Sequence, residues 1–267
     1  IIDLDKKFFV NKENVDFTGN ELRRRQYLSG FSVEDLEMIL HPMVEDGKEA
    51  TGSMGDDTPV AVLSSHFRPL SHYFRQNFSQ VTNPPIDSLR ENKVMSLKTR
   101  FGNLGNILDF NNLTEEKIYV LNSPILTNFQ FKKFKKLFVK KIKIIDCTFN
   151  IKESLKGNLD RIKFESEIAI REGSSTLILT DKNVTDNRAN IPMVLSVGAV
   201  NSHLVNRGLR GYCSINVETS ETLDTHSFAV LIGVGATTVN PYLTIDSIYQ
   251  RYEKKLFGKL NFSVCVE

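Results

Sequence analysis

Short apolar strands that alternate with helices after residue 123 limit the fold of this chain more than any other feature. The strand-like segments are KKIKIIDCTF (140–149), STLILTD (175–181) and YCSINVE (212–218). Helix-like segments separate them, and HSFAVLIGVGATTVNPYL (226–243) predicts a helix–glycine–helix unit. Such alternation indicates β-α-β units around a parallel sheet. Because the strands are apolar, we expect a sheet that is buried on both faces. The fold class is therefore α/β, with residues 123–267 as its core.

Residues 1–122 have a different character and predict an N-terminal segment of helices and loops that packs on this core. The clearest helix starts after Phe31. Ser32 is a good N-cap, an acid stands at the third helical position, and Phe31 and Leu36 are spaced for a hydrophobic staple. Gly47 is a suitable end for that helix. VAVL (60–63) predicts a short buried strand.

The stretch SQVTNPPIDS (79–88) ends the next predicted helix firmly. The residue before a proline avoids the helical region, so Asn83 and Pro84 are both expected to be extended. Pro84 and Pro85 also remove two backbone donors, which leaves nearby carbonyl groups to face water, side chains or a ligand. From these residues alone, a stiff helix terminator is the simpler interpretation, and a rigid row of acceptors is the functional one.

Composition excludes several classes of function. Lys and Arg number 34 against 32 Asp and Glu, so the net charge of +2 gives no field suited to nucleic acid or an acidic membrane. The 3 cysteines lie far apart, which disfavours disulfides and a zinc site and favours a reducing compartment. No apolar run approaches the roughly 20 residues that span a bilayer. The chain starts without Met and stops within an apolar run, so we expect a piece of a longer polypeptide.

Four segments could carry chemistry, and for each the simpler interpretation is structural. GSMGDD (52–57) lacks the Gly-Lys-Ser/Thr of a phosphate loop and fits a turn. GVGA (233–236) lacks the third glycine and the preceding strand of a dinucleotide fingerprint. The lysine-rich segment 130–143 fits a solvated amphipathic helix, with binding of nucleic acid or membrane as the alternative. The best candidates for a stand-alone barrel-type enzyme follow a predicted strand, where α/β active sites lie: Asp181, Asp186 and Arg188.

Several motifs, taken together and in order, resemble one known family. They are MVEDGKEATGSMGDDTPVAVLS, YFRQNFSQVTNPPIDSLRENKVMSL, SPILT, TLILTD, IPMVLSVGAVNSHLVNRGLR and HSFAVLIGVGATTVNPYL. These stretches look like the central domain of the large (alpha) subunit of glutamate synthase, over roughly residues 31–250. GSMGDDTP and QVTNPPID are the most specific of them.

The resemblance implies a fold and a place in a larger enzyme. The family's central domain is α/β and related to its FMN barrel, so we expect an incomplete or degenerate (β/α) barrel with parallel strands, preceded by a mainly helical N-terminal region. In the family, a glutamine amidotransferase domain precedes this domain and an FMN- and iron–sulfur-binding domain follows it. These two domains of the same chain are the expected partners. The parent makes two glutamates from glutamine, 2-oxoglutarate and two electrons.

The chain lacks the features that the resemblance assigns to the family's reaction centres. It has no terminal cysteine nucleophile, no closely spaced cysteines for an iron–sulfur cluster and no complete flavin site. We therefore expect no catalytic, cofactor-binding or metal-binding residues in this piece, with FMN and an iron–sulfur cluster elsewhere in the parent. The resemblance implies a cytoplasmic location, or a plastid in a photosynthetic eukaryote.

In the family, ammonia moves from the glutaminase site to the flavin site through an internal tunnel. Carbonyl acceptors would guide ammonia without trapping it, whereas carboxylates would favour the ammonium cation. Candidates for the tunnel lining are therefore Thr82, Asn83, Pro84 and Pro85. Candidates for a contact between domains are Ser53, Met54, Gly55, Asp56 and Asp57.

Some positions depart from the family's usual pattern. Asn201-Ser202-His203 stands where His-His-His is common, and Gly233-Val234-Gly235-Ala236 where Gly-Tyr-Gly-Ala is common. These departures argue against a role for His or Tyr side chains at those positions. They leave the motifs that depend on backbone shape intact.

Overall fold

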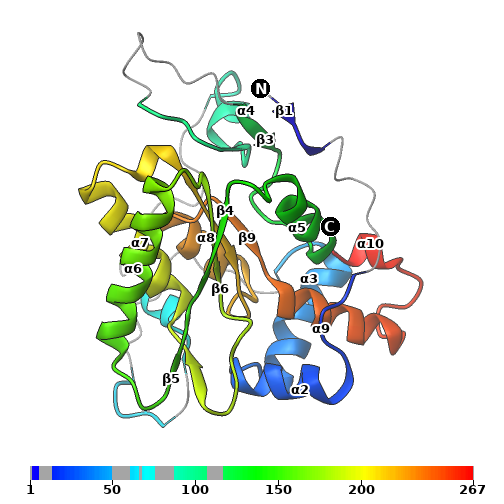
Figure 1. Ribbon diagram of the computed structural model, residues 1–267. Coiled ribbons are helices and arrows are strands. Elements are labelled where there is room, and N and C mark those ends of the chain that lie inside the picture. The colour runs from blue at the N-terminus through cyan, green and yellow to red at the C-terminus, as the bar shows by residue number, and fades with distance from the viewer. Residues whose placement is uncertain are drawn as a thin grey trace.

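A parallel sheet of four strands forms the centre of the molecule (Figure 1). The computed structural model describes residues 2–5, 14–49, 61–65, 68–75, 87–106 and 117–266. The strands are β4 (Ile142–Asp146), β6 (Thr176–Thr180), β8 (Ser214–Glu218) and β9 (Thr238–Asn240). They lie in the order β4-β6-β8-β9, so each strand pairs with the next strand of this sheet along the chain. The predicted α/β class with parallel strands is confirmed.

Three helices cover one face of this sheet: α6 (Leu155–Arg171), α7 (Met193–Asn206) and α8 (Thr225–Gly233). Alternate strand residues, among them Leu177, Ile215 and Val239, are fully buried and pack with these helices into the main hydrophobic core. Burying one such side chain contributes roughly 1.5–3 kcal/mol. Every residue of β6, β8 and β9 is buried, as the sequence predicts, whereas the edge strand β4 exposes Lys143 and Ile144.

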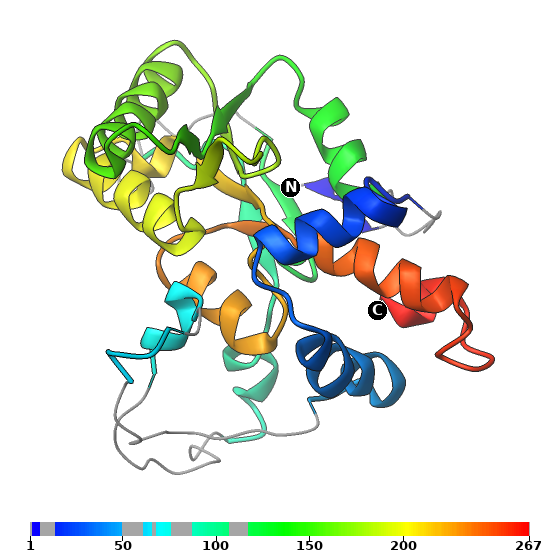
Figure 2. The same ribbon diagram turned by 90° about the horizontal axis from the view of Figure 1, so that it is seen from below.

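Different helices lie at the other face: α5 (Asn128–Leu137), α9 (Tyr242–Glu253) and α2 (Gly19–Leu28). Seen from below, α2 lies beside α9 (Figure 2), and the Gln26 amide donates to the Ser247 hydroxyl at 2.8 Å. A second hydrophobic cluster joins α5 to Ile178 of β6 and to a small sheet of order β1-β3-β2. The strands of that sheet are β1 (Ile2–Asp3), β3 (Tyr119–Leu121) and β2 (Thr99–Phe101).

The remaining elements are short. Six belong to the helical class: η1 (Asp35–Leu40), α3 (His41–Asp46), η2 (Leu70–Tyr73), α4 (Glu91–Val94), η3 (Arg210–Tyr212) and α10 (Phe262–Cys265). A separate antiparallel pair consists of β5 (Thr148–Asn150) and β7 (Arg188–Asn190). Side-chain caps fix the starts of α5, α6 and α8, because Thr127, Ser154 and Asp224 each accept a hydrogen bond from a backbone N–H of the first turn.

The predicted helix after Phe31 is confirmed, including its start. The Ser32 hydroxyl accepts from the Asp35 N–H at 3.0 Å, and the Asp35 carboxylate accepts from the Ser32 N–H at 2.9 Å, which is a reciprocal cap. Phe31 packs in the same hydrophobic cluster as Leu36. Gly47 ends the helix with φ 65°, a left-handed conformation that favours glycine.

Two local predictions are wrong. The buried strand predicted at VAVL is an exposed turn over its described part, because Val62 and Leu63 are 83% and 97% exposed. The predicted helix–glycine–helix unit at 226–243 is wrong because it misses a strand, β9, which lies between α8 and α9. β9 has only three residues, and the sequence around them is apolar on both sides, so the pattern alone does not separate strand from helix.

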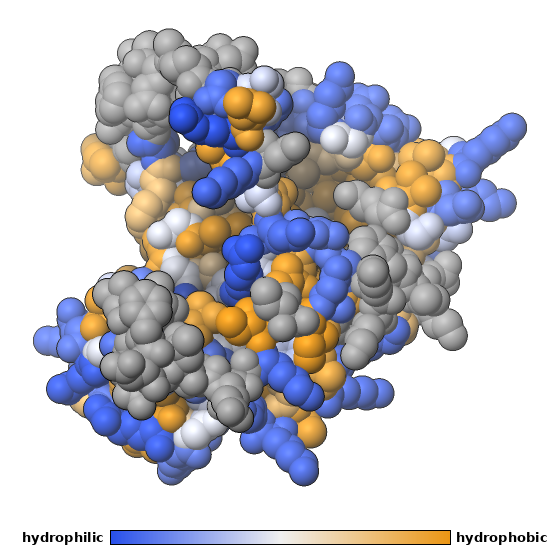
Figure 3. Space-filling view, turned by 90° about the horizontal axis from the view of Figure 1, so that it is seen from above, coloured by the Kyte–Doolittle hydropathy of each residue, from blue (hydrophilic) through white to orange (hydrophobic). Residues whose placement is uncertain are grey.

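Hydrophobic side chains reach the surface in several places. Figure 3 shows patches of them beside hydrophilic ones on the face seen from above. Within the described part of the chain, no helix is both long and apolar enough to cross a membrane.

Candidate functional site

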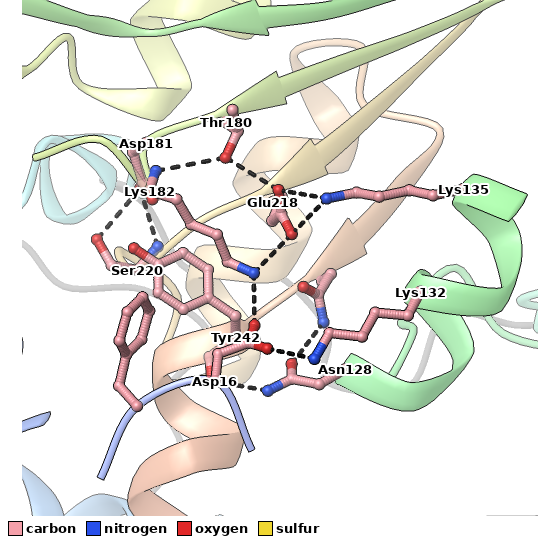
Figure 4. A network of polar contacts seen from close by, with 12 residues as sticks. Asp16, Asn128, Lys132, Lys135, Thr180, Asp181, Lys182, Glu218, Ser220 and Tyr242 are labelled. Carbon is pink, nitrogen blue, oxygen red and sulfur yellow. Dashed lines mark hydrogen bonds and ion pairs between the residues drawn. The ribbon is translucent and has the colours of Figure 1, made fainter. Parts of the chain in front are cut away.

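Charged and polar side chains gather where the parallel strands end (Figure 4). Thr180 ends β6, Glu218 ends β8 and Asn240 ends β9, so their side chains reach the same edge of the sheet. In α/β proteins this carboxyl edge is where ligands bind. Helices α5 and α9 and residues 14–17 close the edge from outside, and the polar groups there form one connected network.

Glu218 is the centre of this network. Its carboxylate accepts from the Lys135 ammonium at 2.8 and 2.9 Å, contacts the Lys182 ammonium at 2.7 Å and accepts from the Thr180 hydroxyl at 3.0 Å. The Glu218 side chain is only 4% exposed. Burial favours its neutral form, but the charges of Lys182 and Lys135 outweigh burial and lower the pKa of Glu218. The carboxylate is therefore ionised, and the neighbouring ammonium groups of Lys135 and Lys182 neutralise its charge.

A second carboxylate, Asp16, belongs to a segment distant in sequence. Lys132 contacts one of its oxygens at 2.7 Å, and Lys182 donates to the other. Burial opposes ionisation, but the hydrogen bonds and charges of these two lysines lower the pKa of Asp16. Lys182 thus bridges Asp16 and Glu218, and these partners raise its own pKa against the effect of burial.

Asp246 of α9 holds the backbone beside Asp16. Its two oxygens accept from the N–H groups of Asp16 at 3.1 Å and Phe17 at 2.9 Å, and the Asn128 amide donates to it at 2.9 Å. Burial raises the pKa of Asp246 to about 7 in spite of these donors. The Asn240 amide in turn donates to the Asn128 side-chain oxygen at 2.9 Å, which ties β9 to α5.

Asp181 lies at the same edge and is fully buried. One of its oxygens accepts from the Thr219 hydroxyl at 2.7 Å and from the Ser220 N–H at 2.9 Å. Burial raises the pKa of Asp181 more strongly than these hydrogen bonds lower it. This carboxyl group therefore fixes the turn after β8 and does not face an open space.

A cavity of about 610 Å³ lies beside this network. It is lined mainly by the loop and strand at 184–190, the segment 221–227, the helix start near Phe31 and the segment 68–73. Glu221 on its wall is half-buried, and loss of water around its carboxyl group, together with the charge of Asp181, raises the pKa of Glu221 to about 8. At neutral pH this wall group is mainly the uncharged acid.

The predicted trio of Asp181, Asp186 and Arg188 does not converge. Asp186 is 75% exposed and pairs with Arg24 at 2.8 Å. Arg188 pairs with Asp146 at 3.0 Å. Asp186 and Arg188 line the cavity, whereas Asp181 is directed into the turn after β8. The three side chains therefore serve three separate contacts.

The amphipathic helix predicted at 130–138 is confirmed as α5, and its aromatic face is buried through Phe131, Phe134 and Phe138. Its lysines are not all solvated, however. Lys132 and Lys135 reach the carboxylates of Asp16 and Glu218. Sequence periodicity separates the two faces of a helix but does not show which buried acids lie across from its charged face.

The GVGA segment forms the turn between α8 and β9 and not a nucleotide loop. Gly235 has φ +123°, and a Cβ there would come within 2.4 Å of the Asn201 side chain. Arg210 donates to Asn201 Oδ1 at 2.7 Å and to the Gly235 carbonyl at 2.9 Å, which holds the turn against α7. A glycine is needed because the turn passes so close to that helix.

Comparison with known proteins identifies the family. The family model described as "Glutamate synthase central domain" matches residues 24–264, which is most of the chain. The chain belongs to the glutamate synthase central domain family. The predicted resemblance is thereby confirmed.

Several curated relatives match this central domain over nearly its whole length. The glutamate synthase [NADPH] large chain of Azospirillum brasilense is 53% identical over 97% of this chain. The large chain of the same name from Bacillus subtilis is 40% identical over 91%, and the ferredoxin-dependent glutamate synthase 1 of Arabidopsis thaliana is 38% identical over 90%. The matched region is only 17%, 16% and 15% of those three proteins, so the chain spans about a sixth of the relatives' length.

The GSMGDDTP motif and residues 80–86 of the QVTNPPID motif lie outside the described residues. This applies to the tunnel candidates Thr82, Asn83, Pro84 and Pro85. It applies equally to the contact candidates Ser53, Met54, Gly55, Asp56 and Asp57. These assignments stay predictions.

The network of the central domain includes residues that the sequence did not single out: Asp16, Lys182, Glu218 and Asp246. A partial indication was present, because Lys182 follows the apolar strand β6 and Glu218 ends the apolar strand β8. Among the described residues, no group of three or more His, Cys, Asp or Glu side chains is placed to hold a metal ion. The three lysines of the network, Lys132, Lys135 and Lys182, each contact a carboxylate of the same chain.

Proposed function

We propose that this chain is the connecting domain of a glutamate synthase large chain. It would link a glutamine amidotransferase domain to a synthase domain that holds FMN and an iron–sulfur cluster. The parent reaction would convert glutamine, 2-oxoglutarate and two electrons into two glutamates. The match of residues 24–264 to the central domain family carries this proposal, because that region is a small share of much longer glutamate synthases.

The connecting domain would take no chemical step itself and would hold no cofactor. The polar groups at the carboxyl edge of its sheet support this view, since the lysines there pair with Asp16 and Glu218 and the Asp181 carboxyl group accepts from Thr219 and Ser220. The order β4-β6-β8-β9, in which successive strands are neighbours, supports a degenerate barrel, because barrels close in that order. The parent would work in the cytoplasm of a bacterium or in a plastid.

The same proposal assigns Thr82–Pro85 to the wall of an ammonia passage between the two reaction sites. Its support is the sequence, where successive prolines fix an extended backbone that presents carbonyl acceptors. Neutral acceptors suit ammonia, since a carboxylate on the wall would stabilise ammonium. The GSMGDD segment would contact a neighbouring domain.

The test is the coupling of the two half-reactions in the full-length polypeptide. Asn83→Ala or Pro84→Ala should lower the amount of glutamate formed per glutamine hydrolysed, because ammonia escapes before it reaches the flavin site. Asn122→Ala, at an exposed position, is the matched control and should leave the ratio unchanged. A ratio that stays tight in the Asn83 and Pro84 variants contradicts the passage and leaves the family assignment untouched.

Neither alternative function gains support from the geometry. A stand-alone enzyme at Asp181, Asp186 and Arg188 would need side chains that converge, and these three serve separate contacts. A basic-helix module at 130–143 would use its lysines as free cations, whereas two of them, Lys132 and Lys135, are paired with acids of the chain. The proposal accordingly includes neither a nucleic acid nor a membrane as partner.

A further inference from the structure

Residues 14–17 lie at the carboxyl edge of the sheet in the manner of a bound ligand (Figure 4). All their partners in the network are more than a hundred residues away along the chain. Asp246 accepts from two successive backbone N–H groups of the segment. Lys132 and Lys182 take the two oxygens of the Asp16 carboxylate, one each. Backbone and side chain are thus both recognised.

The Phe17 side chain adds an apolar anchor. Its ring packs edge-on against Tyr242 with centroids 5.9 Å apart, and the Arg25 guanidinium lies 3.7 Å over its centroid. Arg25 itself donates to the Lys182 carbonyl at 3.0 Å. An aromatic ring between a cation and a second ring is well suited to hold a peptide segment in register.

The charges at this position require an anion. Three ammonium groups, those of Lys132, Lys135 and Lys182, lie within hydrogen-bond distance of two carboxylates, Asp16 and Glu218. Without Asp16, Glu218 alone would face Lys135 and Lys182, and Lys132 would keep only its contact with the Asn14 amide oxygen. The ammonium of Lys182 is largely buried, with its side chain 23% exposed, so water replaces the lost partner poorly.

We propose that Lys132 and Lys182 form a carboxylate-binding site that the chain's own Asp16 occupies. The segment 14–17 is then a built-in ligand that closes the carboxyl edge of the sheet, which is the edge where α/β proteins bind their ligands. The site selects a carboxylate because each of its two oxygens meets one ammonium group, Lys132 from helix α5 and Lys182 from the loop after β6. Asp246 holds the adjacent backbone. When the Asp16 side chain is removed, a small carboxylate such as acetate binds between Lys132 and Lys182 in its place.

Hydrogen exchange read by mass spectrometry tests this in the full-length polypeptide, because peptides report the segment separately from other domains. Asp16→Ala should raise exchange in peptides that cover residues 14–28 and 128–137 by about tenfold or more. Sodium acetate should restore protection along a saturable curve, to within about twofold of the unsubstituted protein at ten times its half-saturating concentration. Sodium chloride at equal ionic strength should not restore it, and sodium phosphate should restore it less.

Matched variants separate a built site from a general salt effect. Asp16→Ala combined with Lys182→Met should not respond to acetate, and Asp160→Ala, which removes a carboxylate paired with Lys163 within α6, should leave these peptides unchanged. Should Asp16→Ala not fold, Asp16→Ser is titrated in its place. No rise in exchange on removing the carboxylate, or equal restoration by chloride or in the Lys182→Met background, overturns the proposal.

Discussion

Gly235 provides the sharpest test of how the sheet is held to its helices. The residue ends the turn between α8 and β9 with φ +123°, a conformation that side chains with a Cβ rarely adopt. A Cβ placed there would lie 2.4 Å from Asn201 Cγ, 2.6 Å from Oδ1 and 2.8 Å from Cβ. Gly235→Ala therefore imposes a backbone penalty and a collision with α7 at the same time.

The magnitude follows from these two contributions. A backbone held in such a sparsely populated region costs about 1–3 kcal/mol. To relieve the collision, the Asn201 side chain must leave Arg210, whose 2.7 Å hydrogen bond is then lost, at about 1–3 kcal/mol for a bond to a charged group. We expect Gly235→Ala to lower the free energy of unfolding by about 4 kcal/mol in sum.

Urea unfolding followed by far-UV circular dichroism measures this, and the method suits a chain with no Trp. With a slope of about 3 kcal/mol per molar urea, the midpoint should fall by more than about 1 M. Gly233→Ala is the matched control. It lies in α8 with open space around its Cβ position, so it should be neutral or slightly stabilising.

Asn201→Gly separates the two contributions, because it removes the three atoms that lie nearest to the new Cβ. In that background, Gly235→Ala should cost only the backbone part, about 1–3 kcal/mol. A cost that is equal in both backgrounds refutes the collision, and a Gly235→Ala protein as stable as the parent refutes the whole reasoning.

Three further predictions concern the interior. Between pH 5 and 8 the native state keeps a proton on Glu221 that the unfolded chain releases, so stability falls as the pH rises, by at most about 1.4 kcal/mol per unit. The urea midpoint of Glu221→Gln should therefore rise relative to that of the parent as the pH increases from 5 to 8. A difference between the two midpoints that does not change with pH would contradict this. Phe134→Ala should cost about 3–5 kcal/mol, because the ring is fully buried among other phenylalanines, whereas Leu137→Ala, 45% exposed, should cost far less. Burial raises the pKa of the Cys147 thiol to about 12, so it should resist alkylation at pH 8 until urea unfolds the chain; modification of the native protein at that position would show that the core is open.

The sequence predicts the elements that depend on local pattern. The strand at 176–180 is centred on an uninterrupted apolar run, Leu177–Leu179, and the helix of Phe131 and Phe134 has a clear apolar face, so both are found where expected. The strand β9 escapes prediction because its three residues become a strand only through pairing with β8 and the bridge to Ile125. Tertiary pairing outweighs local propensity there.

The network was predictable only in part, for a physical reason. A polar residue at the end of an apolar strand, such as Glu218, marks the edge where parallel strands present their side chains. The partner of Lys182, however, is Asp16, 166 residues earlier in the chain. No local pattern connects the two, because the contact exists only after the N-terminal segment has crossed the edge of the sheet. Amphipathic spacing likewise shows a charged face on α5 without showing that two of its lysines, Lys132 and Lys135, pair with acids from other segments.

The two faces of the sheet show why such a network is needed. Residues directed to the helices α6–α8 are apolar, whereas Ser214, Asn216 and Glu218 of β8 alternate with them and are just as buried. Buried charge pairs add little net stability compared with apolar packing, because desolvation offsets their attraction. They do discriminate strongly between arrangements, since any shift that separates Lys182 from Asp16 and Glu218 leaves a buried ion unpaired. The network therefore acts chiefly to fix one position of the N-terminal segment on the sheet, and a domain proposed to set the distance between two reaction sites requires that kind of fixed position.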